Sequence, residues 1–222
     1  MKKSKFPYLM KDIETAPIIE VPRIDGKGTY KFKAYSFGEL GSKMLPELIK
    51  EILKGLTESV RKNFPDFDLV VGIDPGAWCA FLVAYNLRKP FTYFMAPTHV
   101  DALFVLRYPE LWELWPRKKL KELYKDWVKK FPEKFGLVEI KSAYATETFL
   151  YVREDFADVD KVVVVDDVIS RGTTSNKMFE VLSNELKVEV IGAQFILAKS
   201  DNYKKLEKKW GIPIKFLVKD EV

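Results

Sequence analysis

The sequence is poor in several residues on which other protein classes depend. Among its 222 residues it has one cysteine, Cys79, and one histidine, His99. A single cysteine cannot form an internal disulfide, which excludes a disulfide-stapled scaffold and favours a cytoplasmic location. We interpret Cys79 as a small core residue and assign His99 no catalytic role.

Long apolar runs are also lacking. The longest run near the middle of the chain, 77–85, is far too short to span a bilayer. The two lysines near the N-terminus are not followed by the sustained apolar stretch of a secretory signal. We therefore expect no membrane association.

Glutamine occurs once, at Gln194, whereas lysine and glutamate are abundant. This bias is typical of proteins from hot environments, in which labile amides are sparse and ion pairs are favoured. The length of 222 residues indicates one domain with an accessory flap. Hydrophobic residues make up 47% and charged residues 31% of the chain, which is an ordinary globular composition. The net charge of +5 suits either nucleic acid or small polyanions as ligands.

The first 35 residues differ from the rest and are interpreted as an N-terminal hood. Residues 18–35 are rich in β-formers and predict two strands around a turn at 25–28. A helix follows, and its start is either Ser36, with Glu39 completing a capping box, or Ser42, which places Pro46 near the first turn. Its core-facing stripe consists of Met44, Leu48, Ile52, Leu56 and Val60.

From residue 68 onward, short apolar runs alternate with amphipathic ones. This rhythm predicts an α/β fold, with a Rossmann-like parallel sheet covered by helices on both faces. The expected core spans 36–222. Its expected strands are 69–73, 91–95, 149–152, 162–165, 190–198 and 212–218. The expected helices run from the turn at 74–76 to residue 88, from 173 to 186 and from 203 to 210.

The segment 97–136 interrupts the rhythm and is predicted to be a helical insertion opened by Pro116. Its lysines, interleaved with aromatic residues, allow a nucleic-acid surface. An amphipathic helix with solvated lysines explains the same spacing, and we favour this second interpretation. The apolar stripe comprises Leu120, Leu123, Trp127 and Phe131, and the lysines are at 118, 119, 121, 125, 129 and 130.

One motif carries specific chemistry, in the run VVVVDDVISRGTT at 162–174. Four valines predict a buried parallel strand, and Asp166 and Asp167 follow at the carboxyl end, where open α/β sheets bind ligands. The loop 170–174 then leads into a helix and exposes backbone N–H groups, which suit a phosphate dianion. The two carboxylates can accept hydrogen bonds from hydroxyl groups, and a phosphate-binding loop follows them directly. Together they predict a site for ribose 5-phosphate.

This run resembles the phosphoribosyl pyrophosphate (PRPP) signature of the type I phosphoribosyltransferases. The resemblance implies that Asp166 and Asp167 hold the ribose hydroxyls. It also implies that the loop holds the 5-phosphate. Arg171 stands where the family usually has a small polar residue. The loop residues are Ser170, Arg171, Gly172, Thr173 and Thr174.

The same resemblance extends to GIDPGAW, which is similar to the family's pyrophosphate loop. It implies pyrophosphate binding by a tight turn, with Mg²⁺ held through the pyrophosphate and Asp74 as the one candidate protein ligand. The residues of this turn are Asp74, Pro75, Gly76 and Ala77.

Residues 144–161 are similar to the matching part of adenine phosphoribosyltransferases, which have a glutamate just before the tyrosine. Here that position is Ala143, and Glu147 is a candidate substitute. The family's basic flexible loop has only Arg107 and Lys141 as candidates. No general acid or base is assigned.

The resemblance implies an enzyme that transfers 5-phosphoribosyl from PRPP to a base, with Mg²⁺, and releases pyrophosphate. A purine, adenine first, is the expected acceptor, and orotate is the enzymatic alternative. A PRPP-binding regulator without turnover is the non-catalytic alternative. The hood would contact the base, and a homodimer is expected, with no nucleic-acid or membrane partner.

Overall fold

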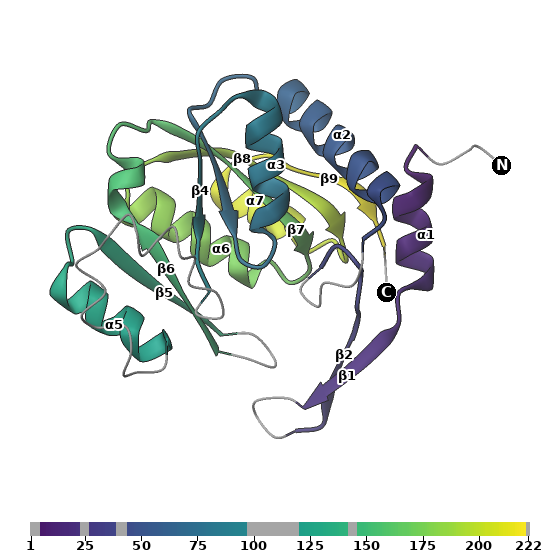
Figure 1. The fold of residues 1–222 in the computed structure, drawn as a ribbon, viewed down its shortest axis with the longest axis horizontal. Helices are drawn as coiled ribbons and strands as arrows, with labels where there is room; N and C mark the ends of the chain where they lie inside the picture. Colours follow the sequence, from purple (N-terminus) through teal and green to yellow (C-terminus); the bar gives the residue numbers. More distant parts are fainter. Residues whose placement is uncertain (1–4, 23–26, 39–43, 97–119, 142–145, 221–222) are drawn as a thin grey trace.

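The computed structural model describes residues 5–22, 27–38, 44–96, 120–141 and 146–220. A parallel sheet of five strands, in the order β4-β3-β7-β8-β9, forms the centre of the molecule (Figure 1). The strands are β3 (Leu69–Ile73), β4 (Phe91–Phe94), β7 (Lys161–Ile169), β8 (Glu189–Ala198) and β9 (Ile214–Lys219). The α/β class predicted from the sequence is confirmed.

Helices cover both faces of this sheet. One face packs against α1 (Pro7–Thr15), α2 (Pro46–Asn63) and α3 (Ala77–Leu87). The other packs against α6 (Thr173–Glu180), its π-helical continuation η3 (Val181–Glu185), and α7 (Tyr203–Trp210).

The valine run of β7 shows why the strand is apolar throughout. Val163 lies in the core under α2 and α3, whereas Val164 lies in the core under α6. Successive side chains of a strand point to opposite faces, so a strand buried on both faces needs apolar residues at every position.

Strand β7 is longer than predicted and includes both aspartates. Its pairing with β3 ends at Val164, whereas its pairing with β8 continues to Ile169. The last five residues of β7 therefore extend past its last pairing with β3. Asp166 and Asp167 lie in this extension, where carboxylates are tolerated because one edge of the strand opens onto a cavity.

The strand predicted at 149–152 does not join the parallel sheet. It belongs to β6 (Thr146–Val152), which pairs antiparallel with β5 (Phe135–Lys141), and a bridge from Leu150 to Met95 attaches this hairpin to the core. The predicted helical insertion therefore extends too far, since β5 begins at 135. A short apolar run does not reveal its pairing partner, and here Gly136 makes room for the ring of Tyr151, 2.1 Å from an added Cβ.

Helix α5 (Leu120–Lys130) packs against the hairpin and forms a small core of its own. Leu123 and Trp127 are fully buried, whereas Lys125 and Lys129 are exposed. The packing interpretation is confirmed for this helix. Pro116 and the lysines at 118 and 119 lie outside the described residues.

The N-terminal ribbon consists of β1 (Ile18–Pro22) and β2 (Thr29–Lys33), which pair antiparallel as predicted. Helix α1, which precedes them, was not predicted. It is held on α2 by the carboxylate of Glu51, which accepts the backbone N–H of Leu9 at 2.8 Å. In Figure 1 the ribbon projects from the sheet on the side of α1.

Helix α2 begins at Pro46 after Leu45, which provides no side-chain cap. The predicted start at Ser36 is wrong, because the Ser36 hydroxyl instead donates to the carboxylate of Asp12. Pro46 lies in the first turn, as the alternative start predicted, and both Ser42 and Glu39 lie outside the described residues.

The polar side chain of Gln194 is fully buried in the core. Its amide oxygen accepts the Ser59 hydroxyl at 2.5 Å, and its amide nitrogen donates to the carbonyl of Phe195 at 2.9 Å. These bonds satisfy the amide and link α2 to β8.

Across the described ranges, no helix combines the length and apolarity needed to cross a bilayer.

Candidate functional site

A cavity of about 330 Å³ opens at the carboxyl ends of β3 and β7. Four segments and one further side chain line it. The segments are the turn after β3, the end of β7 with its following loop, the chain from β2 to Gly38, and the inner face of the β5–β6 hairpin; the side chain is Lys199. This is where ligands bind in open parallel sheets.

The acidic pair lies in the floor of the cavity, and each residue is 7% exposed. The backbone N–H of Asp167 donates to Oδ1 of Asp166 at 2.9 Å, and the N–H of Val168 donates to Oδ1 of Asp167 at 2.6 Å. Each carboxylate thus has one oxygen oriented by the backbone. Oriented carboxylates suit the binding of neighbouring hydroxyl groups.

The turn after β3 packs tightly against this pair. A Cβ added to Gly76 would lie 2.0 Å from Oδ1 of Asp166 and 3.0 Å from the backbone nitrogen of Asp167. Only glycine fits at this distance. The predicted set 74–77 is therefore divided: Asp74 and Pro75 line the cavity, whereas Gly76 and Ala77 are buried behind it.

The carboxylate of Asp74 is oriented by the end of β4. Its Oδ2 accepts the backbone N–H of Ala96 at 3.0 Å, and the carbonyl of Ala96 accepts the hydroxyl of Tyr124 at 3.2 Å. Burial of this phenol, reinforced by the charge of Asp74, raises the pKa of Tyr124 above its ordinary value. The Tyr124 hydroxyl therefore stays protonated at neutral pH and serves as a hydrogen-bond donor.

All five residues of the predicted phosphate loop, 170–174, line the cavity. Gly172 has φ of 75°, in the left-handed region, and precedes the first turn of α6. The first N–H groups of a helix have no intrahelical acceptor, and Gly172 supplies no side-chain cap. These donors and the helix dipole favour an anion at this end of the cavity.

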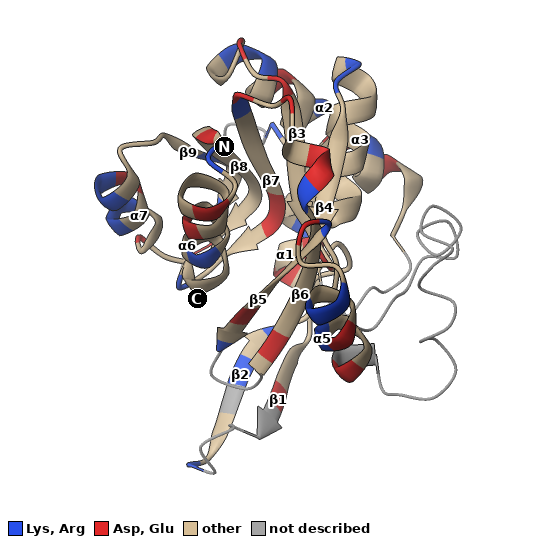
Figure 2. Ribbon diagram, turned by 90° about the vertical axis from the view of Figure 1, so that its left-hand side faces the viewer, with Lys and Arg blue, Asp and Glu red and all other residues tan. Residues whose placement is uncertain are grey.

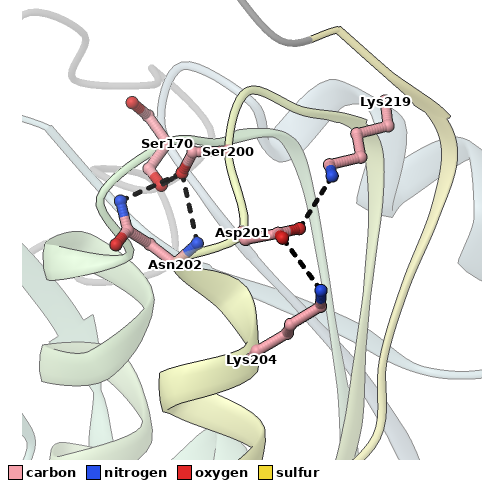
Figure 3. A network of polar contacts seen from close by, with 6 residues as sticks. All are labelled: Ser170, Ser200, Asp201, Asn202, Lys204 and Lys219. Atoms are coloured by element: carbon pink, nitrogen blue, oxygen red, sulfur yellow. Dashed lines mark hydrogen bonds and ion pairs between the residues drawn. The ribbon is translucent and has the colours of Figure 1, made fainter.

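The loop is anchored from behind by the connection between β8 and α7 (Figure 3). The Ser200 hydroxyl donates to the carbonyl of Ser170 at 2.9 Å. Asp201 holds the same connection to two elements, with ion pairs to Lys204 at 2.8 Å and Lys219 at 2.7 Å. These lysines lower the pKa of Asp201, Lys204 first. The first residue of the loop is thus attached to a connection that is itself held at two points.

The sequence predicted only some of the residues that form two walls of the cavity. Lys141 and Glu147, named as candidates from the sequence, both reach the cavity from the hairpin. Tyr35 and Lys199 also line it, and no local sequence signal marked them. Arg107, the other candidate for the flexible loop, lies outside the described residues, as do His99, Ala143 and Tyr144.

Cys79 lies beneath the turn and is 1% exposed. Its thiol donates to the carbonyl of Gly76 at 2.9 Å. Burial raises the pKa of this thiol, and the charges of Asp166 and Asp167 raise it further. Cys79 is a small core residue, as predicted, and is suited to packing beneath the turn.

If the insertion at 97–136 shields the reacting centre of an enzyme, its tryptophans are expected near the cavity mouth or a dimer interface. Trp127 lies instead in the small core between α5 and the hairpin. Trp112 and Trp115, expected there as well, lie outside the described residues. Figure 2 shows basic residues spread over several elements, α5 and α7 among them, with acidic residues between those of α5.

Comparisons with known proteins were made with both the sequence and the fold. No family model and no curated protein sequence matches the chain. The fold is similar to that of adenine phosphoribosyltransferase from Thermoanaerobacter pseudethanolicus, with a TM-score of 0.59, 20% identity, and coverage of 95% of this chain and 99% of that one.

Two further solved structures share the fold. The adenine enzyme from Giardia lamblia, complexed with 9-deazaadenine, has a TM-score of 0.61 at 12% identity, covering 96% of this chain and 98% of its own. Orotate phosphoribosyltransferase from Aeropyrum pernix has a TM-score of 0.54 at 17% identity, covering 95% and 91%. The chain therefore has the fold of the phosphoribosyltransferases, as the motif predicted.

Proposed function

We propose that this protein is a phosphoribosyltransferase, which transfers 5-phosphoribosyl from PRPP to a ring nitrogen of a purine and releases pyrophosphate. One observation carries the proposal. The acidic pair, the phosphate loop and the turn at Asp74 come from separate parts of the sequence and line one cavity in a phosphoribosyltransferase fold.

Each part has a distinct role in this proposal. Asp166 and Asp167 accept the ribose hydroxyls, and the loop 170–174 binds the 5-phosphate through backbone N–H groups and hydroxyls. The turn at Asp74 and Pro75 lies next to the acidic pair, where it meets the pyrophosphate. The three sites together hold PRPP across the carboxyl ends of β3 and β7.

The reaction breaks the bond from C1 of the ribose to the pyrophosphate oxygen, which leaves with the electron pair. A lone pair on the base nitrogen forms the new bond to C1, and the proton of the base is lost to solvent or to the released pyrophosphate. Positive character grows on the ribose, so catalysis consists mainly of positioning the two reactants and stabilising charge. The β5–β6 hairpin, whose Phe149 and Glu147 line the cavity, helps to exclude water from the reacting atoms.

Mg²⁺ fits the residues present. The described part of the chain holds no group of three or more His, Cys, Asp or Glu that could bind a metal by itself. Asp74, Asp166 and Asp167 nevertheless offer carboxylate oxygens to the cavity, and Mg²⁺ commonly binds one or two carboxylates together with substrate phosphates. When bound, the ion neutralises charge on the leaving pyrophosphate.

The fold neighbours support a purine as acceptor and orotate as the alternative, since their structures are those of adenine and orotate enzymes. The N-terminal ribbon, treated as a hood over residues 1–35, contacts the base in this proposal, because Phe32 and Tyr35 line the cavity. We further propose a homodimer in the cytoplasm.

A regulator that binds PRPP without turnover is the second candidate. Two residues favour it: Ala143 replaces the glutamate of the adenine enzymes, and Arg171 departs from the usual loop sequence.

The deciding experiment measures pyrophosphate release from PRPP with a panel of purine and pyrimidine bases. We expect base-dependent release, and weak, non-selective binding to duplex DNA that falls with salt. Absence of turnover with every base, together with sequence-selective DNA binding, would reverse the choice.

A further inference from the structure

We propose that Tyr124 is a positioning residue for the pyrophosphate site and acts on it through Ala96 and the carboxylate of Asp74. The inference rests on the proposed function and deepens it, because it gives the accessory unit a part in pyrophosphate binding. The accessory unit is helix α5 together with the β5–β6 hairpin, which pack around a small core (Figure 1).

The end of β4 holds Asp74 at two points. The backbone N–H of Asp74 donates to the carbonyl of Phe94 at 3.0 Å, and Oδ2 of Asp74 accepts the backbone N–H of Ala96 at 3.0 Å. The first bond continues the pairing of β3 with β4. The second bond makes the direction of the carboxylate depend on the position of Ala96.

Ala96 is held by the accessory unit. It lies beyond Phe94, the last residue of β4, where the pairing with β3 has ended. Met95, the residue before it, exchanges two backbone hydrogen bonds with Leu150 of β6, at 2.8 Å and 2.9 Å. The carbonyl of Ala96 itself accepts the hydroxyl of Tyr124 at 3.2 Å. At this point of the chain, contacts with the accessory unit replace pairing within the parallel sheet.

The Tyr124 side chain has little freedom to move. It is 1% exposed and packs against Trp127, with ring centres 5.5 Å apart. Helix α5, which carries it, is also joined to β5 by an ion pair between Lys125 and Glu139 at 3.6 Å. A hydroxyl on a buried ring of a packed helix has a defined position, and its hydrogen bond restricts the position of the acceptor.

The direction of the Asp74 carboxylate matters because pyrophosphate is also negatively charged. Two anions repel each other at close range, and a carboxylate helps to bind pyrophosphate only when a cation such as Mg²⁺ is shared between them. Sharing the ion requires a well-placed oxygen, because Mg²⁺ accepts little departure from octahedral geometry. A carboxylate that turns away from its position loses this attraction, and binding of magnesium pyrophosphate should weaken.

The ribose 5-phosphate end of the cavity is held by other contacts. Asp166 and Asp167 each accept a backbone N–H from β7, and the loop 170–174 is attached to the connection after β8. These contacts involve no residue of the accessory unit. A change at Tyr124 should therefore weaken the binding of pyrophosphate and leave the binding of ribose 5-phosphate as it is.

The test is Tyr124→Phe, which removes the hydroxyl and keeps the buried ring. Calorimetry compares two ligands in the wild type and the variant, pyrophosphate with Mg²⁺ and ribose 5-phosphate. We expect the affinity for magnesium pyrophosphate to fall by roughly 3- to 10-fold, as for the loss of one hydrogen bond. The affinity for ribose 5-phosphate should not change.

The matched control is Tyr151→Phe. Tyr151 is a hairpin tyrosine that is also 1% exposed, and its hydroxyl donates to the carboxylate of Glu185 at 2.7 Å. Neither Tyr151 nor Glu185 is among the described residues that line the cavity. This variant should melt at a lower temperature and keep both affinities.

A double-mutant cycle determines whether Tyr124 acts through Asp74. Asp74→Ala removes the carboxylate and should itself weaken the binding of magnesium pyrophosphate. In this background Tyr124→Phe should cause no further loss, because the group that it positions is gone.

Four results would overturn this inference alone. They are wild-type affinity for magnesium pyrophosphate in Tyr124→Phe, an equal loss for both ligands, a loss that persists in Asp74→Ala, and a wild type that does not bind magnesium pyrophosphate. Absence of turnover with every base would overturn the proposed enzyme instead. The affinities do not depend on turnover, so they would still decide the role of Tyr124.

Discussion

Two strand-to-helix connections, β3–α3 and β7–α6, leave neighbouring strands and reach the same cavity, but they are built differently. Each is three residues long. In the first, Gly76 is buried against Asp166 where no side chain fits. In the second, Gly172 has a positive φ that few other residues adopt. The first connection thus depends on the absence of a side chain, and the second on a backbone conformation. Substitutions in the two connections should therefore have different effects on stability and binding.

The largest effect is expected for Gly76→Ala. Its φ of −72° suits alanine, so the cost is purely steric and arises from the 2.0 Å approach to Asp166. The turn and the acidic pair must separate, and we expect a loss of about 1–3 kcal/mol in stability together with a loss of PRPP binding. Thermal unfolding and calorimetric titration measure the two effects. Wild-type PRPP affinity in this variant would show that the two parts are not coupled.

Next in size are Asp166→Asn and Asp167→Asn. Each removes a charged acceptor for a ribose hydroxyl in a largely buried site, and each should weaken PRPP binding by about 1–3 kcal/mol. Melting temperatures should change little. The exposed Asp158→Asn serves as the control. If calorimetry finds unchanged affinity in both variants, the acidic pair does not bind the ribose.

Gly172→Ala should have a smaller effect, of about 1–2 kcal/mol, because an alanine at positive φ is strained. The nearest atom to the added Cβ is a terminal methyl of Leu206 at 2.5 Å, which can rotate away.

Gly211→Ala is the matched control, since its φ is 67° and no atom lies within 4 Å of the added Cβ. Both variants should lose similar stability in urea, but only Gly172→Ala should also lose affinity for inorganic phosphate. Equal phosphate affinity in the two variants would argue against an anion site at 170–174.

The smallest effect concerns Cys79, which supports the first connection from below. In the folded protein it should not react with a thiol reagent, because it is 1% exposed and burial raises its pKa. It should react fully in denaturant. Rapid labelling of the native protein would mean that the turn above it opens easily.

The sequence predicted the second connection almost completely, because its signals are contiguous. Valines, aspartates, small loop residues and the helix follow one another within 162–174. For the first connection it predicted Asp74 but placed Gly76 in the cavity, since the contact with Asp166 spans ninety residues of chain. Such a contact follows from the order of the strands in the sheet, which local patterns do not encode.

Contacts between segments that are distant in the sequence also explain the other features that the sequence did not predict. Lys199 and Tyr35 meet because β8 and the ribbon converge on one rim, and neither residue stands in a motif. The hairpin was missed because the apolar run at 149–152 gives no information about an antiparallel partner at 135–141. Helix α1 has only Leu9 and Ile13 as a buried stripe, which is too little periodicity to detect.

Gln194 gives this protein a built-in spectroscopic label. It is the only glutamine in the chain, so selective ¹⁵N-glutamine labelling yields one side-chain amide pair without crowding. The hydrogen bonds to Ser59 and Phe195 hold that amide fully inside the core, where exchange with solvent requires the sheet to open. The amide also lies on the strand that leads to Lys199, so its chemical shift can report whether a ligand at the rim alters β8.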